Sequence, residues 1–148
     1  MTIHNDSEFK SALSGLDPAR QRRAAARFVE RVLDLSGDVR VRASVEAAQR
    51  GDLQEAEREV LFQAANTARV ESFTQCGREA DWGAQAGHFV AKAAVSCVKA
   101  IVAGESIAWD AAMHARMART FQSLADGVGT ETREAEAQYA ILDEILKA

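Results

Sequence analysis

A single proline interrupts the 148 residues of this chain, and it lies near the start, at Pro18. Proline breaks helices because it lacks a backbone N–H donor and its ring clashes with the preceding turn. About one residue in five is alanine, which has the highest helix propensity of all residues. No stretch shows the turn-bounded alternation of apolar and polar residues that is typical of a β-hairpin. The sequence therefore predicts an all-α protein without a β-sheet.

Apolar periodicity and helix-terminating residues divide the chain into six expected helices. They span residues 17–35, 38–51, 52–73, 81–102, 106–125 and 130–148, and Asp17, Asp38, Asp52 and Ser106 are the expected N-caps of four of them. We expect residues 17–148 to form one helical domain, a compact bundle of about five to six helices that could be built of helical hairpins. Residues 1–16 are expected to be a flexible N-terminal tail or a short helix.

The helix expected at residues 81–102 is apolar on most of its circumference, which is typical of a helix at the centre of a bundle. The helix at 52–73 begins with a capping-box pattern, formed by Asp52 and Glu55. Its apolar pattern places Leu53, Ala56, Val60, Ala64 and Ala68 toward the core. Residues 64–70 and 111–117 share the pattern A-A-x-x-A-R-apolar, and this similarity would fit a structural repeat.

Charge and composition indicate a soluble, cytoplasmic protein. The net charge is −4 and the isoelectric point is near 5.4, whereas a nucleic-acid-binding domain is typically basic. No apolar run is long enough to span a membrane, and residues 1–10 lack the pattern of a signal peptide. Cys76 and Cys97 form no metal-binding or redox motif. We therefore expect neither membrane association nor general binding to nucleic acid.

Motifs that would indicate an enzyme or a metal site are missing from the sequence. These are the Glu-x-x-His pairs of di-iron bundles, the H-E-x-x-H of zinc proteases, the glycine-rich phosphate loop and the G-x-S-x-G turn of hydrolases. The sequence therefore predicts no catalytic residues, no metal and no cofactor, and we expect a protein that is not an enzyme.

Two histidines, His88 and His114, lie on apolar faces of expected helices that follow one another in the chain. Together with Glu71 or Cys97 they could line a small buried site for a ligand or a metal. The alternative is that each is a core histidine whose ring is hydrogen-bonded to a neighbouring group. The sequence favours the core interpretation.

Two charged stripes are candidates for contact with a partner. Asp52, Glu55 and Glu59 are spaced i, i+3, i+7, so their carboxylates share one side of a helix, and we predict that a protein partner docks on them. The alternative is an ordinary solvated face. The basic stripe could contact phosphates, but a solvated face paired with acids elsewhere is the favoured interpretation. It consists of Arg20, Arg23, Arg27 and Arg31, with Arg40 and Arg42 soon after.

Three segments resemble a known family. Residues 40–48 read RVRASVEAA, residues 63–69 belong to an alanine-rich helix, and residues 86–93 read AGHFVAKA. This combination resembles the all-α immunity proteins of bacterial toxin systems, over about half of the chain. Val41 stands where that family often has proline, and the segment after Ala91 lacks a second histidine.

The resemblance implies a cytoplasmic protein that binds and neutralises a cognate toxin without catalysis. The leading expectation is therefore a non-catalytic binding protein. One alternative is a small-molecule or metal-binding helical protein that uses His88 and His114. A second is a helical regulator that contacts nucleic acid through the helix at 17–35. The identity of the partner and the oligomeric state stay open.

Overall fold

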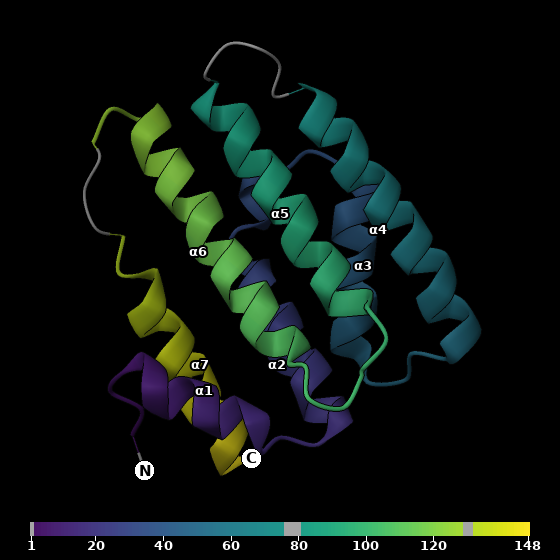
Figure 1. The fold of residues 1–148 in the computed structure, drawn as a ribbon, viewed down its shortest axis with the longest axis vertical. Coiled ribbons are helices and arrows are strands. Elements are labelled where there is room, and N and C mark those ends of the chain that lie inside the picture. The colour runs from purple at the N-terminus through teal and green to yellow at the C-terminus, as the bar shows by residue number, and fades with distance from the viewer. Residues whose placement is uncertain (1, 76–80, 129–131) are drawn as a thin grey trace.

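The computed structural model describes residues 2–75, 81–128 and 132–148, and this part of the chain is all-α (Figure 1). It contains seven α-helices and one short 3-10 helix, and no strand, which confirms the predicted fold class. None of these helices combines the length and the apolarity needed to cross a membrane. The elements are α1 (Asp6–Ser14), α2 (Pro18–Glu30), η1 (Leu33–Leu35), α3 (Val39–Arg50), α4 (Glu55–Gln75), α5 (Trp82–Val98), α6 (Ile107–Ala125) and α7 (Glu134–Lys147).

The longer helices form two layers (Figure 1). In the front layer α6, α5 and α4 lie side by side with α5 in the middle, and α2 and α3 lie behind them. Helix α5 packs against α2, α3, α4 and α6, and the side chains that it buries include Ala86, Val90, Ala93, Cys97 and Val98. The central place expected for this helix is confirmed.

Side-chain caps begin the helices where the sequence predicts them, with one exception. Asp17, Asp38 and Ser106 each accept a hydrogen bond from a backbone N–H in the first turn of α2, α3 and α6. Gly51 ends α3 with a φ of 79°, a left-handed conformation that glycine adopts without a steric penalty. The exception is Asp52, because α4 begins only at Glu55. Instead, the Asp52 carboxylate accepts a hydrogen bond of 3.3 Å from Arg50 Nε.

Two helices are shorter than expected. Helix α2 ends at Glu30 instead of residue 35, and the chain continues as η1. Helix α5 ends at Val98 instead of Val102. The last helix begins at Glu134, and its expected start at Thr130 lies outside the described residues.

At the N-terminus the structure shows a short helix, α1, whose Phe9 and Leu13 are fully buried. The Phe9 ring lies 5.5 Å from the Phe28 ring of α2 and 5.2 Å from the Tyr139 ring of α7. Helices α1 and α7 therefore close the lower end of the bundle, where both chain termini lie (Figure 1).

The inward face predicted for α4 is wrong. Val60 is 69 % exposed and Ala56 is also exposed, and only Ala68 of the predicted set is buried. The side chains that face the bundle are those of Arg58, Ala65 and Ala68. Helix α4 has apolar residues on more than one side, so the periodicity alone could not select the buried side.

The two segments with the shared A-A-x-x-A-R pattern lie on α4 and α6, which flank α5 on opposite sides (Figure 1). Equivalent alanines are buried in both, Ala65 and Ala68 on α4, and Ala112 and Ala115 on α6. Small buried side chains let neighbouring helices approach closely. The shared pattern therefore marks two similar packing surfaces.

Candidate functional site

Glu55 and Glu59 of the acidic stripe lie in the first turns of α4, whereas Asp52 lies in the segment before the helix and not, as predicted, on the same helix face. Arginines partly neutralise all three carboxylates. Glu55 and Glu59 lie 2.7 Å and 3.0 Å from Arg58 Nη2, and the hydrogen bond from Arg58 is the main cause that lowers the pKa of Glu55. Arg50 contacts both Asp52 and Glu57. Four carboxylates against two guanidiniums still leave this surface net negative, and all four carboxylate side chains are at least 45 % exposed.

Glu55 and Glu59 also have a structural role, because they hold Arg58 at the end of α5. The Arg58 side chain is only 7 % exposed, and its Nη1 donates to the carbonyl of Val98 at 2.8 Å. From α2, Arg22 Nη1 donates to the carbonyls of Cys97 at 2.8 Å and Lys99 at 2.9 Å. The last carbonyls of a helix lack intrahelical partners and carry a partial negative charge, so these two guanidiniums cap α5.

His88 has the environment of a core histidine. It is 7 % exposed, and its Nδ1 lies 2.9 Å from the Ser72 hydroxyl oxygen of α4. Burial and, secondarily, the nearby positive charge of Lys92 lower the pKa of His88 below its usual value. The ring also lines a pocket of about 380 Å³ between α4, α5 and the segment before α3. These observations agree with the core interpretation that the sequence favoured.

Of the residues expected to join His88 in one ligand site, only His114 lies near it. Both histidine rings contact Phe89, whose ring centre is 5.7 Å from His88 and 6.1 Å from His114, and the charge of His88 is one of the causes that lower the pKa of His114. Glu71 turns away to pair with Arg40 at 2.6 Å. Cys97 lies nine positions along α5 from His88, and full burial raises the pKa of its thiol to about 12. Within the described residues, no three His, Cys, Asp or Glu side chains form a group that could hold a metal.

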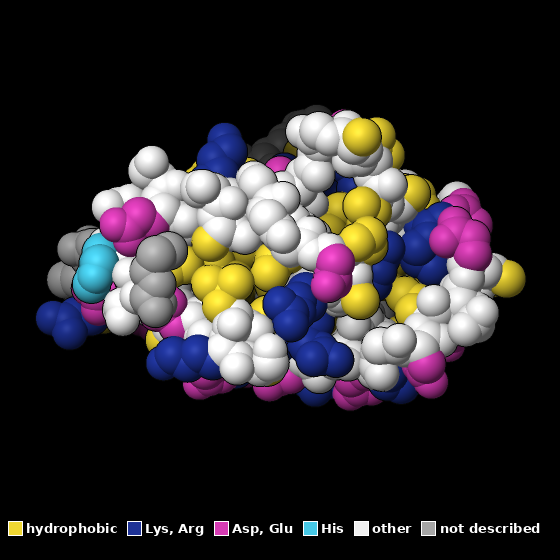
Figure 2. All heavy atoms as spheres, turned by 90° about the horizontal axis from the view of Figure 1, so that it is seen from below, with side chains coloured by type: hydrophobic (Ala, Val, Ile, Leu, Met, Phe, Trp, Pro, Cys, Tyr) yellow, Lys and Arg dark blue, Asp and Glu magenta, His cyan; other side chains and the backbone are white. Residues whose placement is uncertain are grey.

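The predicted basic stripe serves mainly to attach the last helix. Arg27 pairs with Glu144 at 2.7 Å and Arg31 with the buried Glu134 at 2.9 Å, so α7 packs along α2. Arg20 donates to the carbonyl of Ala148. Figure 2 shows the lower end of the molecule, where positive and negative side chains are interspersed rather than gathered into a basic patch. In the part of the chain that the structure describes, only Arg23 and Arg42 of the stripe have no ion pair.

Aromatic rings from the front layer form a continuous row that the sequence did not predict. Phe121 of α6 stacks on Trp82 at 5.7 Å and on Phe89 at 5.3 Å, both from α5. Phe73 of α4 contacts His88 at 5.6 Å, and His88 contacts Phe89. The row therefore crosses the upper half of the layer from α4 to α6, where α5 begins and the other two helices end (Figure 1).

Several apolar side chains in and beside this row are exposed. Phe73 is 68 % exposed and Trp82 is 39 % exposed. Met117 and Leu124 are also exposed, and they lie on the same face of α6 as Phe121, about one turn on either side of it. We call this surface the aromatic face, and it comprises Phe73, Trp82, Phe89, Met117, Phe121 and Leu124.

Positive charge accompanies the aromatic face. Lys92 Nζ lies 4.8 Å from the centre of the Phe89 ring. Arg69, one turn before Phe73, donates to Asn66 and is the second cation near His88. Neither Lys92 nor Arg69 forms an ion pair with any residue that the structure describes.

Comparison of the chain with protein-family models, with curated proteins and with solved structures finds no match in any of the three.

Proposed function

We propose that this chain is a non-catalytic binding protein of the immunity type, and that its protein partner docks on the aromatic face. The observation that carries the proposal is the row of rings across α4, α5 and α6, in which Phe73 and Trp82 are exposed, Phe89 and Phe121 are half-buried, and the buried His88 joins Phe73 to Phe89. Contiguous exposed apolar surface on a protein commonly marks a site of association, and Trp and other large apolar side chains supply much of the binding energy there.

The resemblance to toxin-neutralising immunity proteins also supports the aromatic face as the docking site. The segment AGHFVAKA, residues 86–93, contributes His88, Phe89 and Lys92 to the aromatic face or to its border. The proposed partner is therefore a toxin whose gene lies next to the gene for this chain. Because Lys92 and Arg69 border the rings and pair with no carboxylate that the structure describes, the surface of the toxin that fits would present apolar side chains bordered by Asp or Glu.

Docking on Asp52, Glu55 and Glu59 stays a competing prediction. Two of those three carboxylates already hold Arg58, and a partner would have to share them. The same arrangement changes the choice of test variant. Glu59→Lys would place an ammonium beside Arg58, so Glu59→Gln is the better test of the acidic stripe.

The test uses the purified product of a toxin-type gene adjacent to the gene for this chain, with affinity measured by calorimetry. Phe73→Asp should weaken binding about tenfold or more, because it places a carboxylate in the apolar contact. Val60→Asp is the matched control, since it changes an equally exposed apolar residue of the same helix that lies outside the aromatic face. Val60→Asp and Glu59→Gln should each stay within about twofold of wild type.

Each outcome distinguishes the alternatives. Loss of binding in Glu59→Gln, with Phe73→Asp unchanged, would move the docking site to the acidic stripe. No binding of the adjacent product by the wild-type chain would overturn the toxin assignment. A concentration-dependent dimer in sedimentation that Phe73→Asp abolishes would instead assign the aromatic face to a second copy of this chain.

A further inference from the structure

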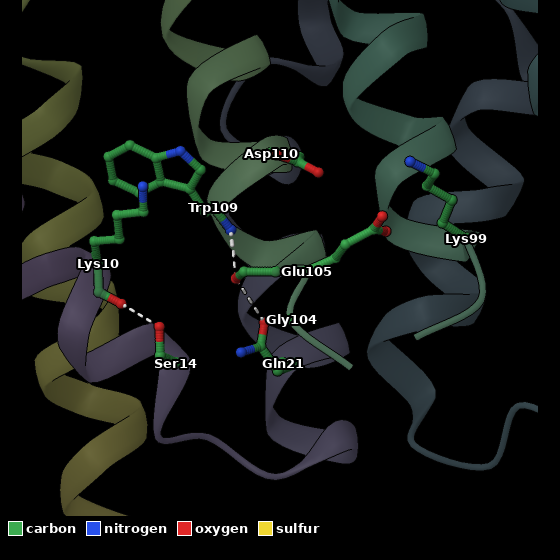
Figure 3. Close-up of a pocket in the computed structure, with 9 residues that line it drawn as sticks. Lys10, Ser14, Gln21, Lys99, Gly104, Glu105, Trp109 and Asp110 are labelled. Carbon is green, nitrogen blue, oxygen red and sulfur yellow. Dashed lines mark hydrogen bonds between the residues drawn. The ribbon is translucent and has the colours of Figure 1, made fainter. Parts of the chain in front are cut away.

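A pocket of about 510 Å³ lies between α1, α2 and the start of α6 (Figure 3). The start of α6 is at the lower end of the bundle, whereas the aromatic face is in its upper half (Figure 1). Its volume falls within the range of about 300–1,000 Å³ typical of small-molecule sites. The surrounding side chains come from segments far apart in the sequence, including Lys10 of α1, Lys99 after α5 and Trp109 of α6.

Hydrogen bonds fix the floor of this pocket. Gln21 is 7 % exposed, and its Oε1 accepts from the Ser106 hydroxyl at 3.2 Å and from the Ala108 N–H at 3.3 Å. Its Nε2 donates to the carbonyl of Leu13. A single buried amide thus ties α1, α2 and α6 together, while Lys99, Gly104 and Glu105 come from the segment that connects α5 and α6.

The indole of Trp109 forms an apolar wall. Its ring packs against the buried Phe9 ring at 6.1 Å, and Lys10 Nζ lies 5.0 Å from its centre. A cation over an indole is stabilised by the negative face of the ring. This contact holds the Lys10 ammonium beside the wall without neutralising its charge.

Four charged side chains line the pocket, two of each sign, namely Lys10, Lys99, Glu105 and Asp110. None of them forms an ion pair with any residue that the structure describes, whereas elsewhere most arginines are paired. Figure 3 shows Lys10 and Trp109 on one side of the pocket and Lys99, Glu105 and Asp110 on the other. The pocket therefore has a positive end beside an aromatic wall and an opposite end with two carboxylates and one ammonium.

We propose that this pocket binds a small zwitterion, a molecule with an ammonium group at one end, a carboxylate at the other and an alkyl chain between them. The ammonium would lie beside Glu105 and Asp110, the carboxylate beside Lys10, and the alkyl chain against Trp109. A zwitterion meets opposite charge at both ends, whereas a ligand with a single charge meets it at only one.

The experiment titrates the full chain with 4-aminobutanoate, 6-aminohexanoate and 8-aminooctanoate, and with hexanoate and hexylamine as half-ligands. Binding is followed by the NMR signal of the Trp109 indole N–H, which is distinguished from that of Trp82 with the variant Trp82→Phe. At an ionic strength of about 20 mM, where screening is weak, at least one amino acid of the series should bind about tenfold more tightly than either half-ligand.

Surface variants identify the contacts. Lys10→Met should reduce the affinity for the best amino acid to that of hexylamine, and Glu105→Gln should reduce it toward that of hexanoate. Lys147→Met and Asp126→Asn change exposed charges away from the pocket and are the matched controls. The proposal is overturned if no amino acid of the series shifts the Trp109 signal, if a half-ligand binds equally well, or if Lys10→Met binds as wild type does.

Discussion

At the scale of single residues, the buried His88 and the half-buried His114 both contact the Phe89 ring. His88 is held by the Ser72 hydroxyl, and burial is the main cause that lowers the pKa of both His88 and His114. Lys92 is the second cause for both rings. A charged imidazole would be desolvated and placed near another cation, so the neutral form is the one that the fold stabilises.

This environment predicts a loss of stability in mild acid. Below about pH 6.5 the histidines of the unfolded chain take up protons, while the folded chain, with lowered pKa values, takes up fewer. Between pH 8 and pH 6.5 the stability of wild type should therefore change little, and it should fall as the pH drops from 6.5 to 5.5. The loss is at most about 1.4 kcal/mol per pH unit for each histidine. Urea unfolding at pH 8 and pH 5.5 measures it.

The variant His88→Gln separates this effect from other titrations. It should lose less stability than wild type between pH 8 and pH 5.5, whatever its stability at pH 8. Asp6, Asp38, Glu55 and Glu71 also have lowered pKa values because of arginine partners, but they lose their contribution only near pH 4. An equal acid loss in wild type and variant would show that His88 is not kept neutral.

Sequence reasoning anticipated the apolar surroundings of these histidines, but not that both rings contact Phe89 or that Glu71 pairs with Arg40. The helical period places each histidine on the apolar face of its own helix, so its apolar surroundings could be predicted. Which side chains surround each ring depends on the register of α5 against α4 and α6. That register is set by the packing of alanines from all three helices, and no local pattern encodes it.

At the scale of helices, long-range hydrogen bonds explain the boundary that the sequence misplaced. Ile101 and Val102 continue the apolar pattern of α5, and the pattern therefore predicts a helix to residue 102. The helix ends at Val98 because Arg58 and Arg22 reach its last carbonyls from α4 and α2. Capping by side chains 40 and 75 residues away leaves no local signal, in contrast to the caps at Asp17 and Ser106.

The cap predicts that Arg58→Met destabilises the protein by about 1–3 kcal/mol, because a buried carbonyl loses its donor and methionine cannot replace it. Arg50→Met is the control on the same surface, since the Arg50 side chain is 50 % exposed and its ion pairs are worth about 0–1 kcal/mol. The midpoints of denaturant unfolding of the two variants, compared with wild type, measure both losses of stability. Equal midpoints for the two variants would mean that the guanidinium of Arg58 contributes nothing beyond a surface pair.

The same arginine explains why the buried side of α4 was not predicted. Arg58 occupies an inward position that a hydrophobicity pattern assigns to solvent, and Val60 occupies an outward position that the pattern assigns to the core. An arginine can be buried when its charge and its donors are satisfied, here by Glu55, Glu59 and the Val98 carbonyl. Such satisfaction is visible only once α4 and α5 are placed together.

At the scale of the whole molecule, the class and the central helix were predictable because they rest on properties of long segments. Proline content, alanine content and the nearly all-round apolar surface of α5 do not depend on any single contact. The place of α7 was not predictable, because it depends on Arg27 and Arg31 finding Glu144 and Glu134 more than a hundred residues later. The aromatic face likewise exists only where three helices meet.

Helix α5 lies in the middle of the front layer and also packs against α2 and α3 of the layer behind. We therefore expect a valine-to-aspartate substitution to have very different effects on α5 and on the outer side of α4. Val90 is fully buried on α5, whereas Val60 is 69 % exposed on α4. Val90→Asp places a carboxylate at a fully buried position of the apolar core, and an unpaired buried charge costs several kcal/mol. Because the total stability of a domain is about 5–15 kcal/mol, Val90→Asp should leave the chain largely unfolded.

Val60→Asp should remain folded, with a midpoint within about 0.5 kcal/mol of wild type, because substitutions at exposed positions rarely matter more. Val95→Asp should fall between the two, because Val95 is only half-buried on the same helix as Val90. Circular dichroism and urea unfolding of the three variants give the comparison. A folded Val90→Asp with the wild-type midpoint would remove α5 from the centre of the bundle, whereas an unfolded Val60→Asp would mean that the outer side of α4 is covered.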